Sequence, residues 1–231
     1  MQIEIFSDVV CPWCYIGKRH LEEALESFLH ADKVDVVYRS FQLDPTTPED
    51  VAETMTEALG RKYNQAPAQI AEMQQRVIDT AAAAGLDFQL EHTHPENTFD
   101  AHRLLHWALE HGKQSELKER LMSAYFTEGA RVGRHEVLAD LAAEVGLDRA
   151  EAERVLASTE YSGEVGSDLS LARSFGATGV PFFVFDRTYA VSGGQPATVF
   201  TEVLEKAWSE GNPLTTVGGD GQACTDDSCS I

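Results

Sequence analysis

Two cysteines, Cys11 and Cys14, stand three positions apart near the start of the chain, shortly after an apolar run that ends at Phe6. Pro12 and Trp13 separate them. Two sulfurs at this spacing can exchange with a disulfide, form half of a zinc site, or pack as inert thiols in a core. Which of these applies depends on the elements that hold the pair.

A strand, a helix and a second strand are expected around the pair. Residues 2–6 and 34–43 have the composition of β-strands, and residues 11–30 place apolar side chains at helical spacing. Pro12 then lies in the first turn of the helix, where a missing N–H has no cost. Cys11 would face unsatisfied N–H groups and the positive end of the helix dipole, which favour the thiolate.

This placement favours redox chemistry. We expect the pKa of Cys11 to fall below the usual value of about 8.5. Cys11 is then the exposed attacking sulfur, and Cys14, one turn further on, is the buried partner that resolves a mixed disulfide. A zinc half-site is the alternative, but no second Cys or His pair lies near it in sequence. Inert buried thiols would need neither Pro12 nor a helix start.

Composition narrows the function classes. The chain has 231 residues, is 43% hydrophobic and carries a formal charge of -20, so it can bury a large core and repels nucleic acid and anionic lipid. Residues 1–6 have no basic leader character, and no apolar run reaches membrane-spanning length. We therefore expect a cytoplasmic protein with no nucleic-acid or membrane partner. In a reducing cytosol, its four cysteines are poor candidates for structural disulfides.

The middle of the chain is helical in pattern. Helices are predicted to begin at 47–50 and to cover 67–85, 97–112, 115–127, 135–145, 148–157 and 160–174. Strands follow at 181–185 and 189–191, joined by a turn at 186–188, and a last helix at 196–210. We predict a discontinuous domain of residues 1–47 and 177–210, an inserted helical domain of residues 48–176, and a flexible tail of residues 211–231.

Several motifs together carry a family resemblance. The chain has Cys11-Pro12-Trp13-Cys14-Tyr15-Ile16-Gly17 after its first strand, Thr178-Gly179-Val180-Pro181 before a later strand, and a long helical insertion between them. In this it resembles the DsbA-like thioredoxin-fold oxidoreductases. Asn97-Thr98-Phe99-Asp100-Ala101-His102-Arg103 and Ser192-Gly193-Gly194-Gln195 are similar to the FrnE-like branch. The resemblance covers residues 1 to about 210. It implies an α/β, thioredoxin-like fold with a large all-helical inserted domain.

The resemblance also implies a substrate site. Pro181 would be a cis-proline beside the sulfurs, with the N–H and C=O of Val180 turned to solvent to pair with an extended substrate segment. An ordinary trans proline opening an edge strand is the alternative. Pro12 and Trp13 are further expected contacts of the substrate. Trp13 stands where the DsbA type has His and cannot carry positive charge, so we expect a weaker oxidant.

Other polar and aromatic residues have simpler interpretations. His102 and Arg103 are expected to be structural or surface residues. Core positions are expected for Phe99, Trp107 and Tyr125. A solvated acidic face is expected for Glu116, Glu119, Glu151 and Glu153.

A second cysteine pair, Cys224 and Cys229, lies in the tail. The chain after Trp208 is long enough to reach the first pair, and a four-residue spacer can close into a disulfide. We expect the tail pair to relay oxidising equivalents to or from Cys11 and Cys14. Four sulfurs gathering one zinc ion, or thiols without a role, are the alternatives.

The predicted function is thiol–disulfide exchange by a protein disulfide oxidoreductase or isomerase. Its partners would be protein thiols and disulfides, together with low-molecular-weight thiols, with no cofactor and no metal. One alternative is a glutathione-dependent isomerase or transferase, because related folds use Ser where Cys11 stands. Another is a zinc-binding or redox-sensing interaction module without turnover.

Overall fold

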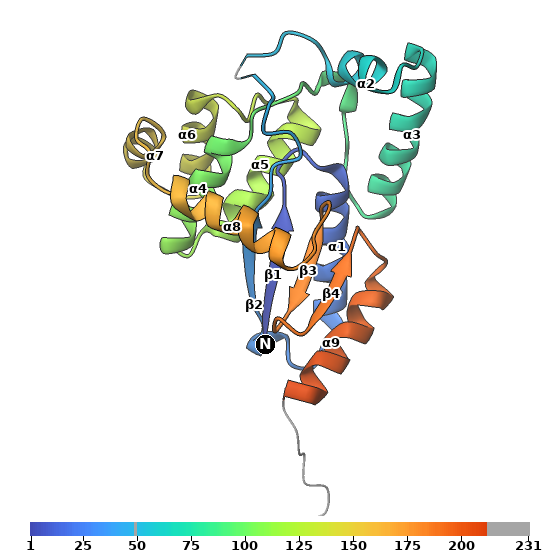
Figure 1. The fold of residues 1–231 in the computed structure, drawn as a ribbon, viewed down its shortest axis with the longest axis vertical. Helices are drawn as coiled ribbons and strands as arrows, with labels where there is room; N and C mark the ends of the chain where they lie inside the picture. The colour runs from blue at the N-terminus through green and yellow to red at the C-terminus, as the bar shows by residue number, and fades with distance from the viewer. Residues whose placement is uncertain (49, 212–231) are drawn as a thin grey trace, which may run out of the picture.

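A mixed four-stranded sheet forms the centre of the molecule. The computed structural model describes residues 1–48 and 50–211. Strands β1 (Gln2–Ser7), β2 (Asp35–Ser40), β3 (Phe182–Phe185) and β4 (Tyr189–Ser192) lie in the order β2-β1-β3-β4 (Figure 1). β1 is parallel to β2 and antiparallel to β3, and β3 is antiparallel to β4. The first and last parts of the chain therefore share one sheet.

Alternation of side chains along the strands gives the sheet two apolar faces. Ile3 and Ile5 of β1 pack in one cluster with α1 (Pro12–Ser27) and α9 (Ala197–Gly211). Phe6 packs on the other face, in a cluster that includes α8 (Ser162–Ser174). Because the period is two residues, a slip of one position would move each set to the opposite face, away from the side chains that it packs against.

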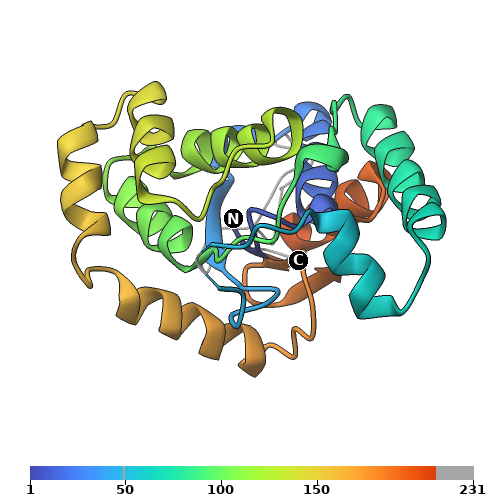
Figure 2. The same cartoon turned by 90° about the horizontal axis from the view of Figure 1, so that it is seen from above.

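Seven helices, among those in the described part of the chain, lie between β2 and β3. They are α2 (Met55–Tyr63), α3 (Pro67–Ala83), α4 (Phe99–Glu110), α5 (Gln114–Glu128), α6 (His135–Glu144), α7 (Arg149–Leu156) and α8. Two short 3₁₀ turns complete the elements, at Ala31–Lys33 and Leu90–His92. Seen from above, these helices surround the strands, with α2 and α3 on one side and α4 to α7 on the other (Figure 2).

The largest apolar cluster joins the cysteine segment to these helices. Val9, Cys11, Cys14 and Ile16 share it with side chains of α4, α5, α6 and α7, such as Leu121. The beginning of α1 therefore lies at the contact between the sheet and the helical layer. None of the helices in the described ranges is both long enough and apolar enough to cross a membrane.

Most predicted helices are present, but the one expected to begin at 47–50 is not. Thr47, Pro48 and Asp50 are not helical, and α2 begins at Met55. The reason is a capping box, in which the Thr54 hydroxyl accepts from the backbone N–H of Glu57 and the Glu57 side chain accepts from that of Thr54. Thr47 is buried instead, and its carbonyl accepts a hydrogen bond from the Asn97 side chain.

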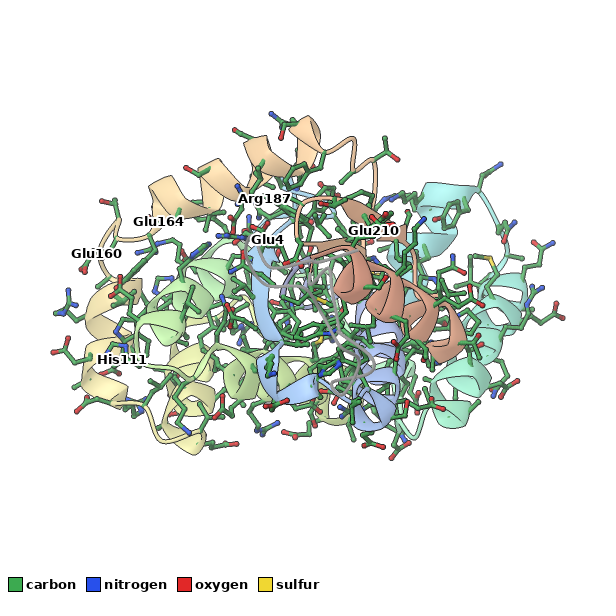
Figure 3. All side chains as sticks on the ribbon, turned by 90° about the horizontal axis from the view of Figure 1, so that it is seen from below. Glu4, His111, Glu160, Glu164, Arg187 and Glu210 are labelled. Atoms are coloured by element: carbon green, nitrogen blue, oxygen red, sulfur yellow. The ribbon has the colours of Figure 1, made fainter. Side chains whose placement is uncertain are left out.

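The predicted turn between β3 and β4 is confirmed. Asp186 and Arg187 have φ of 46° and 54°, and the backbone N–H of Thr188 donates to the carbonyl of Phe185 at 2.9 Å. Two consecutive left-handed residues define the tight turn that matches the twist of a hairpin. The turn brings Arg187 beside Glu4 at the lower end of the sheet, where both are labelled in Figure 3.

Glu4 is a buried carboxylate on the face of the sheet that α8 covers. Arg187 Nε donates to its Oε2 at 2.8 Å, and Arg39 Nη2 donates to its Oε1 at 2.8 Å. The hydrogen bond from Arg187 is the main reason that the pKa of Glu4 is lowered, against burial, which raises it. The two guanidinium groups thus compensate the charge that the sheet buries.

Arg103 is a structural residue, which is one of the two roles expected for it from the sequence. Its side chain is buried, and its Nη2 donates to the carbonyls of Val155 and Ser158, each at 2.6 Å. Its Nε donates to the carbonyl of Glu160 at 2.7 Å. The Arg103 guanidinium therefore donates hydrogen bonds to the backbone carbonyls where α7 ends, and it attaches that end of α7 to α4.

We predict that Arg103→Met lowers the free energy of unfolding by about 3 kcal/mol, because it removes the hydrogen bonds that a buried guanidinium donates to the chain around the end of α7. Chemical denaturation measures this directly. Arg149→Met is the matched control: Arg149 forms exposed ion pairs with Asp140 and Glu153, so its loss should cost less than about 1 kcal/mol. Equal effects of the two substitutions would contradict this role of Arg103.

Candidate active site

Cys11 and Cys14 lie together at the start of α1. Cys11 is the N-cap residue, in extended conformation, and Pro12 is the first helical residue. The backbone N–H of Cys14 donates to the carbonyl of Cys11 at 3.0 Å, and the two side chains hydrogen-bond to each other. Both thiols are free. The position predicted for the pair at the N-terminus of the first helix is confirmed.

The expected exposure of Cys11 is wrong. Cys11 and Cys14 each keep only 3% of their surface exposed. Val10 and Val180, both half-buried, pack against the cluster that contains Cys11, and Val180 comes from a segment far along the chain. Trp13 is the exposed residue of the motif, at 43%. A partner sulfur must therefore reach Cys11 past these side chains.

Cys14 is held as a neutral thiol. Burial, followed by the hydrogen bond and the charge of Cys11, raises the pKa of Cys14 well above its ordinary value. The charge of Lys118 and a hydrogen bond to the backbone of Asp8 act in the opposite direction but are smaller. Cys14 therefore keeps its proton at neutral pH in the reduced protein.

The segment before β3 lies directly beside the first sulfur. The peptide bond between Val180 and Pro181 is cis, as the resemblance implied. Cys11 Sγ donates to the carbonyl oxygen of Val180 at 3.7 Å. That carbonyl therefore contacts the thiol rather than facing only solvent. Val180 itself is half-buried, and Pro181 is buried.

Gly17 lets this segment approach α1 closely. A Cβ at Gly17 would lie 3.1 Å from Phe183 Cζ, 3.2 Å from Gly194 Cα and 3.3 Å from Pro181 Cγ. A Cβ at Gly194 would lie 3.0 Å from the carbonyl oxygen of Trp13. Gly17 thus lets the Val180–Pro181 segment lie close to α1, and Gly194 lets the segment after β4 do the same.

Asp8, which the sequence analysis did not single out, lies between β1 and the cysteines. Its Oδ1 accepts from the backbone N–H of Val9 at 2.8 Å and lies 3.3 Å from His102 Nε2, and its Oδ2 accepts from the N–H of Leu43 at 2.8 Å. Burial would raise the pKa of Asp8, but the hydrogen bonds from His102 and Leu43 contribute to lowering it. The sequence signal that could have identified Asp8 is its position as a charged residue directly after the buried strand β1.

His102 is the partner of this carboxylate. It is fully buried on α4, where burial lowers its pKa and Asp8 opposes that effect. Its contact with Asp8 makes it structural, as expected. Through Asp8, His102 is connected to the segment that leads from β1 to Cys11. Arg103, the next residue along, points to the end of α7 instead.

Lys118 is the second residue that the sequence analysis missed. It lies on α5 and is 1% exposed. It precedes the buried Leu121, Met122 and Tyr125 by three, four and seven positions, which puts it on the apolar face of the helix. A lysine within an apolar stripe was thus the sequence signal.

The remaining predicted residues have mixed outcomes. Trp107 and Tyr125 are core residues, as predicted, whereas Phe99 is half-buried and lines a cavity of about 590 Å³ with Asn97, Arg134 and His135. Glu119 is not simply solvated, because its carboxylate accepts hydrogen bonds from Tyr15, Lys18 and Arg19 and connects α5 to α1.

Cys224 and Cys229 lie outside the described residues. Within residues 1–48 and 50–211, no group of three or more His, Cys, Asp or Glu side chains could hold a metal ion.

Comparison with known proteins agrees with this arrangement. Residues 2–205 match the DSBA-like thioredoxin domain. The chain belongs to this family. The crystal structure of a probable DsbA oxidoreductase, SCO1869 from Streptomyces coelicolor, is similar with a TM-score of 0.88 and 42% identity, and covers 100% of this chain and 99% of that one.

Two more relatives extend the comparison. The protein YwbO of Bacillus subtilis is 28% identical over 91% of this chain and 96% of its own length. The cytosolic disulfide reductase DsbM from Pseudomonas aeruginosa, solved with GSH, shares the fold with a TM-score of 0.62 and 20% identity, over 89% of this chain and 98% of that one. The predicted α/β, thioredoxin-like fold with an inserted helical region is therefore confirmed.

We predict that Gly17→Ala destabilises the protein by about 1 to 3 kcal/mol, although alanine is normally favoured by about 1 kcal/mol inside a helix. The added methyl group would push on Phe183, Pro181 and Gly194. Denaturant unfolding gives the free energy. Gly166→Ala in α8 is the control, because nothing lies within 4 Å of its Cβ position, and it should be neutral or stabilising. Stabilisation by both substitutions would contradict the close approach.

Proposed function

We propose that the protein is a thiol–disulfide oxidoreductase that exchanges disulfides with protein substrates through Cys11 and Cys14. The observation that supports this best is the pair of free, mutually hydrogen-bonded thiols at the first turn of α1 in a DSBA-like domain. Two thiols one turn apart at the start of a helix can attack a disulfide and then close on each other.

The exchange proceeds in two steps. In the reducing direction, the Cys11 thiolate attacks one sulfur of a substrate disulfide, and the other substrate sulfur leaves as a thiolate. Cys14 then loses its proton and attacks Cys11, which forms the Cys11–Cys14 disulfide and releases the second substrate thiolate. The substrate gains two electrons and two protons, and the protein loses them. The reverse sequence oxidises a substrate dithiol.

Val180, Pro181, Trp13 and Pro12 form the proposed substrate contact. Trp13 is exposed and Pro12 is half-buried, so both present apolar surface beside the sulfurs. An extended substrate segment would pair with the backbone of Val180, whose carbonyl lies 3.7 Å from Cys11 Sγ. Such pairing places a substrate sulfur next to the attacking one.

The finer assignments are part of the same proposal. We place the chain in the FrnE-like branch on its Asn97–Arg103 and Ser192–Gln195 motifs, and we propose a cytoplasmic enzyme that needs no cofactor. Trp13 cannot add positive charge beside the sulfurs, which fits a weaker oxidant than a protein with His there. Low-molecular-weight thiols are candidate partners beside proteins.

We predict that Cys14→Ser traps a mixed disulfide between Cys11 and substrate, because the resolving sulfur is gone. Reduced Cys14→Ser protein mixed with insulin whose disulfides are intact, or with a scrambled disulfide protein, would reveal the adduct by non-reducing electrophoresis and mass spectrometry. Cys11→Ser is the control and should form none. Adducts on Cys14 in the Cys11→Ser variant, or glutathione conjugation of small electrophiles without disulfide exchange, would contradict the proposal.

The tail pair completes the proposed relay. Cys224 and Cys229 would exchange with the Cys11–Cys14 pair, because a tether raises their effective concentration at the site. Replacing both with Ser should slow turnover with a large external oxidant or reductant while leaving single-turnover exchange at Cys11 unchanged. Comparing steady-state with single-turnover rates measures this. Unchanged steady-state turnover would remove the relay and leave the main proposal intact.

A further inference from the structure

A cavity of about 590 Å³ lies where the loop after β2 meets the first turns of α4 and α6. None of the residues that line it takes part in the exchange between the cysteines. Its walls combine an aromatic ring, two amides and several charged groups, and they include Gln42, Phe99 and Glu136. Ligand cavities in proteins span about 300 to 1,000 Å³, so this cavity is large enough to receive side chains of another molecule.

The cavity lies at the same end of the sheet as the cysteines. Because β1 and β2 are parallel, the chain leaves both strands at one edge of the sheet, toward Cys11 after β1 and toward Gln42 after β2 (Figure 1). Leu43, the next residue, is exposed, and its N–H donates to Asp8 Oδ2 at 2.8 Å. The carbonyl of Asp8 accepts from the N–H of Cys11 at 3.4 Å. A polypeptide that reaches Cys11 can therefore continue over Leu43 to the cavity.

The positive groups of the cavity wall already have partners. Arg134 Nη2 donates to Asp50 Oδ1 at 2.9 Å, and His135 Nε2 lies 2.6 Å from Asp100 Oδ2. The other oxygen of Asp100 accepts from Arg103 Nη1 at 2.7 Å. Among the described residues that line the cavity, no unpaired cation is therefore left for an anionic ligand.

Acceptor groups remain available. Within residues 1–48 and 50–211, neither the Glu136 carboxylate nor the Gln42 side-chain amide forms a hydrogen bond or an ion pair. Phe99, half-buried at the first turn of α4, adds its ring to the wall. An aromatic ring beside a carboxylate favours a guanidinium or ammonium group, through cation–π attraction and charge-assisted hydrogen bonds.

The charge of the cavity wall favours the same kind of ligand. Asp50, Asp100 and Glu136 contribute three carboxylates, whereas Arg134 is the one arginine or lysine among the described residues of the wall. The whole chain carries a formal charge of -20, so a cationic polypeptide is attracted to the protein from solution. A basic side chain thus gains from both the local and the overall charge.

We propose that the cavity receives an arginine or lysine side chain of the protein substrate whose disulfide Cys11 attacks. The inference rests on the proposed function and names the substrate class of the same site, which is polypeptides with a basic residue a short way along the chain from the reacting cysteine. Glu136 binds the cationic group, Phe99 packs against its aliphatic stem, and Gln42 accepts a further N–H. Binding there holds the substrate cysteine near Cys11 before the exchange.

Peptides with a single activated disulfide test the proposal. Each peptide has one cysteine joined to 5-thio-2-nitrobenzoate, which leaves as a coloured thiolate when Cys11 of the reduced protein attacks the peptide sulfur. Arginine is placed in turn at about six positions on either side of the cysteine, a span of roughly 20 Å in an extended chain. The matched peptide has citrulline, a neutral residue of similar shape, at the same position.

The position of the basic residue should matter, because the cavity lies at a fixed place relative to Cys11. At about 20 mM salt, the arginine peptide should react about three- to tenfold faster than the citrulline peptide, at one or two neighbouring positions only. An attraction that came from the overall charge of the protein would favour arginine equally at every position.

Glu136 variants separate the cavity from the overall charge. In Glu136→Gln, the ratio of the arginine rate to the citrulline rate at the preferred position should fall at least about threefold. Glu136→Lys should invert the preference, so that a peptide with glutamate there reacts faster than the arginine peptide. Glu164 is the matched control, because it is also an exposed carboxylate in the first turn of a helix but does not line the cavity. Glu164→Gln and Glu164→Lys should keep the wild-type ratio within about twofold.

The outcomes are distinct. Equal rates for arginine and citrulline peptides at every position overturn the inference, and so does an arginine advantage that survives Glu136→Gln or that Glu164→Gln removes equally. Peptides that release no coloured thiolate at all overturn the proposed function itself. A position-dependent advantage that Glu136→Gln removes and Glu164→Gln retains supports the inference.

Discussion

The close contact between the first turns of α1 and the Val180–Pro181 segment is the constraint on which the site depends. Gly17 leaves no side chain between these elements, and a Cβ there would press on Phe183 and Pro181. The contact brings the Val180 carbonyl to 3.7 Å from Cys11 Sγ. It also joins the two ends of the chain, because α1 follows β1 while Val180 precedes β3, and β1 pairs with β3.

The cysteines have three buried ionisable neighbours, Asp8, His102 and Lys118, which burial shields from water. Asp8 and His102 satisfy each other and the backbone of Leu43, whereas Lys118 interacts with the cysteines through space. The strand end, α4 and α5 each supply one of these groups. The helical layer therefore places buried charged groups around a pair that the sheet and α1 position.

The sequence predicted the fold well where local patterns decide it. Alternation in β1, the apolar run of β3, helical spacing in α4 to α9 and the turn at Asp186–Arg187 are local signals, and the structure contains each of these elements. The helix expected at 47–50 was wrong because Thr54 and Glu57 form the stronger start signal.

The site was less predictable, because long-range contacts decide it. The expected exposure of Cys11 was wrong because Val180, which is 169 positions away, covers it. Glu119 looked like one of several surface acids, and only the packing of α5 on α1 brings it to Lys18 and Arg19. Lys118 carried a signal in its apolar stripe, but the Tyr38 ring that its amine faces lies on β2, far away in sequence.

A redox titration tests the central claim most directly. Protein equilibrated in buffers of varying glutathione ratio is quenched with an alkylating reagent, and peptides that contain Cys11 and Cys14 are quantified by mass spectrometry. The account predicts that both cysteines lose their alkylation together, in one reversible two-electron transition, with the mass of an internal disulfide. Cysteines that stay alkylated at every ratio, or that acquire glutathione independently of each other, would contradict it.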